Sequence, residues 1–131
     1  SALAHWISSE KNPLTPRVAV NHLWLRRFGQ PLVPTVFDFG KNGMTPYHAE
    51  LLDYLSTELV ESKWSLKKLT KMLVTSHAYR MDSSYDEAGH QVDPDNRFYW
   101  RMNTRRMTAE TVRDSILHIS GSLDPKMGGV E

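Results

Sequence analysis

Acidic and imidazole side chains stand close together in the stretch FDFGKNGMTPYHAELLDYL, residues 37–55. Asp38 lies between two phenylalanines, and His48 follows in the same stretch. A carboxylate and an imidazole can work as an acid–base pair, and an arginine such as Arg80 could hold an anionic group. On this hypothesis Asp38, His48 and Arg80 are the catalytic candidates of a hydrolase. It requires an open pocket in which Asp38 and His48 lie within about 7 Å of each other, as paired acid–base groups do.

The same stretch has a structural interpretation, which we favour. If Phe37 and Phe39 both pack inward, Asp38 is drawn into a partly dry site, where an unpaired carboxylate is costly. We therefore expect Asp38 to accept hydrogen bonds from turn amides or to pair with an arginine. Asn21 lies inside the most apolar helix and should be hydrogen-bonded, fixing the loop that follows Gly29. The predicted structural polar network consists of Asn21, Asp38, His48, Arg105 and Arg106.

Other kinds of site have weaker support. No two of the six histidines stand at the i, i+4 spacing of a helical zinc site, and the chain has no cysteine, so we expect no metal site. Four lysines could form an anion or partner face, although a solvated helix face is the commoner reason for such a run. They are Lys63, Lys67, Lys68 and Lys71. A net charge of +1 argues against a nucleic-acid partner.

Length and composition are those of one soluble globular domain. The chain has 131 residues, of which 40% are hydrophobic and 24% are charged. No apolar run approaches the roughly 18 residues that suggest a membrane span, so none is expected. The chain opens on Ser1 and is helix-like from Ala2, and we interpret it as a piece of a longer protein.

Caps, prolines and apolar spacing predict an all-α fold. We expect an irregular bundle of about four main helices, with minor helical turns and one long extended loop. The main helices should begin after four capping residues, which are Thr15, Thr45, Ser65 and Thr108. Gly29 should end the first of them in a left-handed conformation, and the second should run from Pro46 to about residue 61.

The expected domain spans residues 1–131 and has three parts. Residues 2–79 should hold the N-terminal helices, and residues 80–95 should form an exposed, mobile acidic loop. Residues 96–121 should form a C-terminal helical part. In its last helix Val112, Ile116 and Ile119 are expected to face inward, because they share one side at helical spacing.

An ordered string of motifs resembles a known family. The motifs are NPLTPRVAVNHLW, RRFGQPLV, ELLDYL, WSLKKL, DPDNRFYWRMNTRRMTAETVRDSIL and the closing MGG. They are similar to the planctomycete-specific domain usually numbered one, a domain of uncharacterised function in large exported proteins. One departure is Ala49, where the family more often has proline.

The resemblance implies a setting rather than a reaction. It implies an extracytoplasmic location and a multidomain parent, with a companion planctomycete domain and often a cytochrome-c-like haem domain. Any haem would belong to another region, because this chain has no Cys-x-x-Cys-His motif, so no cofactor is expected here. We therefore expect a helical structural or interaction module whose partners are other domains of the same parent. The rival is a catalytic subdomain of a hydrolase acting on a carbohydrate or sulfated polymer.

Overall fold

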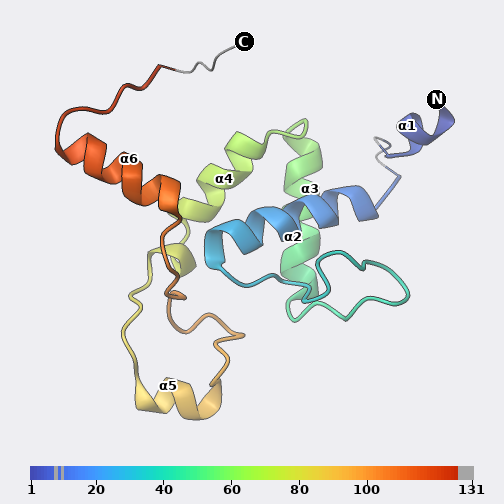
Figure 1. Ribbon diagram of the computed structural model, residues 1–131. Coiled ribbons are helices and arrows are strands. Elements are labelled where there is room, and N and C mark those ends of the chain that lie inside the picture. Colours follow the sequence, from blue (N-terminus) through green and yellow to red (C-terminus); the bar gives the residue numbers. More distant parts are fainter. Residues whose placement is uncertain (8, 10, 127–131) are drawn as a thin grey trace.

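The computed structural model describes residues 1–7, 9 and 11–126, and the regular elements of this part are all helical (Figure 1). The elements are α1 (Ala2–Ile7), α2 (Leu14–Phe28), α3 (Ala49–Glu61), α4 (Leu66–Thr75), the 3-10 helix η1 (Ala78–Arg80), α5 (Glu87–Val92) and α6 (Ala109–Ile119). The four longest are α2, α3, α4 and α6. The all-α prediction is therefore confirmed. The closing MGG motif, residues 127–129, lies outside the described residues.

The hydrophobic core lies where α2, α3 and α4 pack against one another (Figure 1). Each of these helices contributes one apolar stripe, and two residues of the loop after α2 complete the core. The buried apolar residues are Val20, Trp24, Phe28, Leu32, Val33, Leu52, Leu55, Leu59, Leu69 and Leu73. Because this core is built from the first 75 residues, the later segments of the chain pack around it.

An aromatic cluster joins the later segments to α2. Trp24 and Phe28 are stacked, with ring centroids 3.9 Å apart. Tyr79 of η1 and Tyr99 meet the Phe28 ring edge-on, at 5.6 and 5.5 Å. Such offset and edge-to-face pairs stabilise a fold by more than the area they bury.

Both ends of α2 are held by specific contacts. At the start, Asn12 is buried and accepts a hydrogen bond from the Leu14 amide at 3.0 Å, while its own amide donates to the Thr15 hydroxyl at 2.9 Å. The helix thus begins at Leu14, and Thr15 is not the cap that we predicted. At the other end Gly29 has φ +81° and donates to the Leu25 carbonyl, as predicted for a left-handed helix stop.

The predicted start of α3 was three residues too early. The Tyr47 amide donates to the Leu32 carbonyl at 3.2 Å, so it belongs to the loop, and α3 begins at Ala49 after His48. The α3–α4 turn is tight because Lys63 and Trp64 both adopt positive φ, at 56° and 61°. Ser65 then caps α4 as predicted, accepting from the Lys68 amide.

The segment predicted as an exposed acidic loop contains a helix. Asp86 accepts a hydrogen bond from the Gly89 amide at 2.8 Å and so caps α5. The Met102 amide donates to the Asp82 carbonyl at 2.9 Å and connects the start of the segment to the chain beyond its end. Aspartates that suggested a mobile loop therefore act as helix and turn caps, because short carboxylates bond readily to nearby backbone amides.

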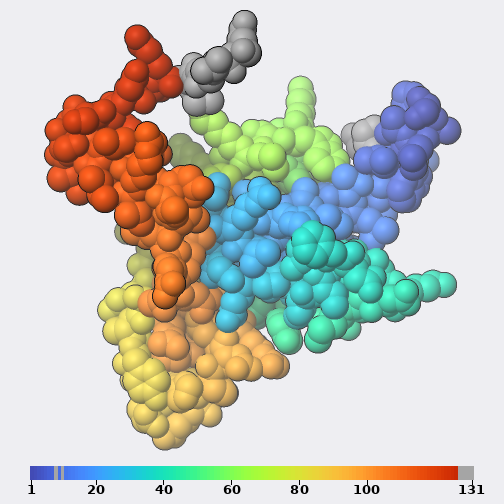
Figure 2. Space-filling view, in the orientation of Figure 1, coloured from blue at the N-terminus to red at the C-terminus, as the bar shows by residue number. Residues whose placement is uncertain are grey.

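α6 begins at its predicted cap, but its apolar side does not face inward. Thr108 accepts from the Thr111 amide, as expected. However, none of the residues of α6 is buried, and Val112, Ile116 and Ile119 are all exposed. Residues 96–107, expected to be partly helical, form turns and extended chain that carry α6 away from the core. In Figure 2 α6, in red-orange, stands out from the body of the molecule.

Candidate functional site

Asn21 is a fully buried polar residue in the centre of α2. Its side-chain amide donates to the Val33 carbonyl at 3.0 Å, and its side-chain carbonyl accepts from the Val33 amide at 2.9 Å. The side chain therefore replaces a backbone partner for a loop residue that is itself buried. Through this contact α2 fixes the loop that follows Gly29.

A second polar centre is built by the motif DPDNRFYWRMN, residues 93–103. Asp93 is buried, and its carboxylate accepts from the amides of Arg97 and Phe98 at 2.9 and 2.8 Å. Asn96 is also buried and donates to the Arg101 carbonyl and to the Asn103 side chain. The side chains of Asp93 and Asn96 thus bond to groups a few residues further along the chain, so the motif folds back on itself as a compact, hydrogen-bonded unit. We call residues 93–103 the DPDN knot.

The DPDN knot is attached to the C-terminal end of α2. Asn103 donates from its side-chain amide to the Phe28 carbonyl at 3.1 Å, and Arg105 donates to the Arg26 carbonyl. These carbonyls lack partners within the helix, and a cation is favourable at this end of the helix dipole. In addition, the Trp24 indole donates to the Tyr99 hydroxyl at 2.7 Å. Of the two arginines in the predicted network, Arg105 thus binds the core helix.

His48 connects the start of α3 to the DPDN knot. Its Nε2 atom donates to the Arg97 carbonyl at 2.8 Å, since a carbonyl can only accept. The ring is half-buried and meets Phe98 edge-on, with centroids 5.8 Å apart. His48 occupies the residue before α3, not the third helical position that we expected, and makes no side-chain cap. Its ring is therefore used to hold two segments together.

The structure does not bring Asp38 into this network. Phe39 packs against the core, but Phe37 is 95% exposed, so the expectation that both rings pack inward is wrong. Asp38 is exposed, and its side chain makes no hydrogen bond or ion pair within the described residues. Its backbone forms the turn instead, with its amide donating to the Thr35 carbonyl at 3.1 Å. The ring of Phe37 meets the ring of His22 edge-on, with centroids 5.8 Å apart.

The three catalytic candidates do not share one site. Asp38 lies on the loop before α3, whereas Arg80 ends η1, and Figure 1 shows these segments on opposite sides of the molecule. Both side chains are exposed, and the ring of His48 is occupied by the Arg97 carbonyl. Arg106, the last member of the predicted network, is exposed and makes no side-chain hydrogen bond or ion pair among the described residues.

A cleft of about 500 Å³ opens between the DPDN knot and the loop after α2. Its charged side chains are Arg97, Arg101 and Asp95, and its walls include Tyr47 and three prolines, Pro31, Pro34 and Pro94. Arg97 pairs with Asp95 at 2.8 Å and lies over the Tyr47 ring, 4.9 Å from its centroid. A volume of this size suits a small organic ligand. Aromatic, cationic and rigid groups therefore meet at one place.

Backbone strain occurs beside this cleft. Asn96 and Tyr99 both have φ +53°, in the left-handed region. Asparagine tolerates this conformation, but for an aromatic residue it is an outlier that its surroundings must enforce. The Tyr99 ring is held by Trp24 and Phe28, which supply that constraint. Arg97 lies between the two strained residues, so its position is fixed by the knot.

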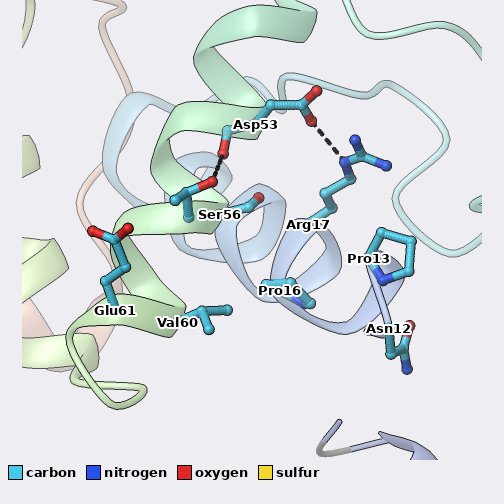
Figure 3. A pocket seen from close by; sticks show the side chains of 9 residues that line it. Asn12, Pro13, Pro16, Arg17, Asp53, Ser56, Val60 and Glu61 are labelled. Atoms are coloured by element: carbon cyan, nitrogen blue, oxygen red, sulfur yellow. Dashed lines mark hydrogen bonds and ion pairs between the residues drawn. The ribbon is translucent and has the colours of Figure 1, made fainter. Parts of the chain in front are cut away.

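A second hollow, of about 460 Å³, lies between α2 and α3 (Figure 3). Arg17 of α2 and Asp53 of α3 form an ion pair across its rim at 2.7 Å, which Figure 3 shows as a dashed line. Both side chains are partly exposed, and such pairs contribute about 0–1 kcal/mol. With Glu61 the hollow is lined by two carboxylates and one guanidinium, so its charge is opposite in sign to that of the cleft beside the DPDN knot.

Comparison with known protein families identifies the family of this chain. A family model described as PSD1, a protein of unknown function (DUF1553), matches residues 1–131. The chain belongs to the PSD1 family. No curated protein and no solved structure matches the chain. The resemblance inferred from the motifs is thus confirmed at the level of a family of unknown function.

Three further expectations for this PSD1-family chain concern its lysine face, a metal site and a membrane span. Lys63, Lys67, Lys68 and Lys71 are all exposed, on and just before α4. Within residues 1–7, 9 and 11–126, no group of three or more histidine and acidic side chains is placed to hold a metal ion. No helix in the same residues has the length and apolar character needed to cross a bilayer.

Sequence reasoning missed the main polar residues of this candidate site. Asp93, Asn96, Arg97 and Arg101 were treated as parts of an exposed loop or of a helical turn. A usable signal was present, because Asp-Pro-Asp-Asn is rich in side chains that bond to their own backbone. Four aromatic or apolar residues, Phe98 to Met102 without the arginine, follow directly and indicate that such a turn is packed against a core.

Proposed function

We propose that this chain is a helical structural and interaction module that packs through α6 against another domain of a larger exported protein. The observation that carries the proposal is the exposure of the apolar side of α6. Val112, Ile116 and Ile119 are 42%, 61% and 85% exposed. They are spaced i, i+4 and i+7 along the helix and therefore share one side.

An apolar helix side of this kind is costly in water. Full burial of an exposed aliphatic side chain contributes about 1.5–3 kcal/mol, and these side chains would contribute less, in proportion to the area that each still exposes. α6 carries charged residues on its other sides, such as Asp114 and Arg113, which form an ion pair with each other at 3.2 Å. The amphipathic pattern thus matches a helix that packs on one side and is solvated on the other.

The rest of the chain supports an interaction role more than a catalytic one. Asn21, Asp93 and Asn96 are buried and hydrogen-bonded to backbone, which is how a fold is fixed rather than how a reacting group is presented. The occupant that we propose for the α6 side is another domain of the same polypeptide. The family resemblance supports this choice, because it implies a multidomain, extracytoplasmic parent.

Thiol accessibility tests the proposal. The 131 residues contain no cysteine, so a variant such as Ile116→Cys carries one thiol in this region. In the isolated chain it should react rapidly with a polar maleimide. In the full-length parent the reaction at this position, followed by peptide mass spectrometry, should slow by an order of magnitude or more, since burial limits access.

Asp114→Cys is the matched control. It lies on the same helix, on the side opposite Ile116, and loses only a surface ion pair. Its thiol should react at similar rates in the isolated chain and in the parent. Equal reactivity of Ile116→Cys in both proteins would show that no domain covers α6 and would overturn the proposal.

A further inference from the structure

We propose that the cleft beside the DPDN knot is a binding site for the oxyanion group of a small acidic ligand, with Arg101 as its main contact. This site is separate from the α6 surface and does not depend on the function proposed for it. The ligand class is an organic anion bearing a carboxylate or a sulfate. The inference rests on which polar groups of the cleft are already satisfied and which are not.

Arg101 is held in position without an acidic partner. Its guanidinium lies over the Trp100 ring at 4.8 Å and near the Tyr85 ring at 5.9 Å. Among the described residues it takes part in none of the ion pairs, which are Arg17–Asp53, Arg97–Asp95 and Arg113–Asp114. These two rings restrict the motion of the Arg101 guanidinium but leave its N–H groups available. Arg101 is thus a positioned cation that lines the cleft.

Arg97 adds a second guanidinium with spare donors. One of its terminal nitrogens bonds to Asp95, and the Tyr47 ring supports its flat face. A guanidinium has five N–H donors, so one bond to Asp95 leaves others free. Arg97 and Arg101 together carry two positive charges against the single carboxylate of Asp95. The charged groups that line the cleft therefore carry an excess of one positive charge.

The other polar groups that line the cleft are uncharged apart from Asp95. The Asn96 side-chain amide donates within the knot, to the Arg101 carbonyl and the Asn103 side chain, and the Asn103 amide donates to the Phe28 carbonyl of α2. The three prolines have no amide proton to offer. Of the described residues that line the cleft, the two arginines are thus the cationic donors, while the Tyr47 hydroxyl and the Gln30 amide, which donates to the Asp95 carbonyl at 3.4 Å, are neutral ones. Guanidinium groups prefer carboxylate and sulfate-like oxyanions, which can accept two parallel hydrogen bonds.

The test uses three ligands with one scaffold. Glucuronate, glucose 6-sulfate and glucose differ only in the group at the sixth carbon, so they separate carboxylate, sulfate and neutral ligands. Binding to the full chain is measured by calorimetry and by NMR of the Trp100 indole N–H, which donates to the Asp93 carbonyl. Either acidic ligand should bind and shift this signal, whereas glucose should not. Which acid binds more tightly identifies the source of the oxyanion.

Variants assign the site to Arg101. Arg101→Gln should weaken binding of the acidic ligand by about tenfold or more, and Arg101→Lys should restore only part of it, because lysine keeps the charge but lacks the planar fork. Arg113→Gln, at an exposed arginine of α6, is the matched control and should bind as the unmodified chain does. Equal weakening by Arg101→Gln and Arg113→Gln would overturn the proposal.

A variant that gains affinity keeps the test independent of folding defects. Asp95→Asn removes the one carboxylate that the described residues contribute to the cleft and frees the guanidinium of Arg97. Binding of the acidic ligand should tighten by a few-fold, and raising the salt concentration should weaken it. If neither acidic ligand binds, if glucose binds equally well, or if Asp95→Asn leaves the affinity unchanged, the cleft is not an oxyanion site.

Discussion

Asn21 and Val33 exchange two hydrogen bonds in the core, so that one side chain satisfies both backbone groups of a loop residue. The donor–acceptor distances are 3.0 and 2.9 Å, and Asn21 has no exposed surface. Neither backbone group of Val33 has water as an alternative, because Val33 is itself buried. This side chain therefore supplies the polar attachment of Val33, beside the apolar packing of Leu32, Val33 and Phe39.

Asn21→Ala should destabilise the domain by about 2–4 kcal/mol, because it leaves a buried amide and a buried carbonyl without partners and opens a small cavity. Urea unfolding followed by tryptophan fluorescence measures the change in the free energy of unfolding. Asn42→Ala, at an exposed asparagine of the same loop, is the control and should change it by less than about 0.5 kcal/mol. A small effect of Asn21→Ala would show that the loop is held elsewhere.

Asp38 and Gly43 should behave in opposite ways to what their residue types suggest. Asp38→Ala should change stability by less than about 0.5 kcal/mol, because the carboxylate is exposed and has no bonded partner in the described residues. Gly43→Ala should cost about 1–3 kcal/mol, since its new Cβ would lie 2.2 Å from the Asp38 carbonyl oxygen. Thermal unfolding of the two variants compares them directly. A large loss for Asp38→Ala would restore the buried-network hypothesis.

Local signals predicted most of the helices. Gly29, Ser65 and Thr108 act as the stop and caps that their types indicate, because a cap depends on a few neighbouring residues. The start of α3 was misplaced because Tyr47 donates its amide to Leu32, a contact across the fold that no local pattern contains. Helix boundaries that are decided by tertiary hydrogen bonds cannot be predicted from local sequence signals.

The candidate site was harder to predict than the helices. The amphipathic pattern of α6 showed which side is apolar, but not whether this chain covers it. Phe37 and Phe39 have the same residue type, yet one is exposed and the other packs against the core. Asp93 looked like an exposed loop residue because its partners are backbone amides, and only the turn-forming composition of Asp-Pro-Asp-Asn indicates them.

Gly89→Ala should destabilise the domain although alanine is the better helix former. Gly89 lies within α5, where alanine would normally gain about 1 kcal/mol. A Cβ at this position would lie 2.7 Å from the Trp100 ring, whose indole is fixed by its bond to Asp93. The ring would have to move, and urea unfolding should show a net loss. Ala88→Gly, on the neighbouring exposed residue, isolates the propensity effect.

A net gain in stability from Gly89→Ala would mean that α5 can shift away from Trp100 without cost. In that case the ring would stay in place, and the NMR signal of the Trp100 indole N–H should not move, because its hydrogen bond to the Asp93 carbonyl would be unchanged. The combination of a stability loss with an altered indole signal is the expected result.

Tyr99 should make stability fall at high pH. Burial raises the pKa of its phenol above the ordinary value of 10.0, and the hydrogen bond from Trp24 opposes this only in part. A raised pKa means that the folded state binds the proton more tightly than the unfolded state. The stabilisation is therefore complete below pH 10 and is lost as the pH rises through the folded-state pKa.

Tyr99→Phe tests this directly. The variant should be less stable by about 1 kcal/mol below pH 10, because the Trp24 indole loses its acceptor. Since phenylalanine does not ionise, its stability should fall less steeply above pH 10, so that the two urea-unfolding curves converge. Tyr54→Phe, at an exposed tyrosine, should give a curve parallel to that of the unmodified chain. Parallel curves for Tyr99→Phe would show that the phenol ionises equally easily in the folded and unfolded states.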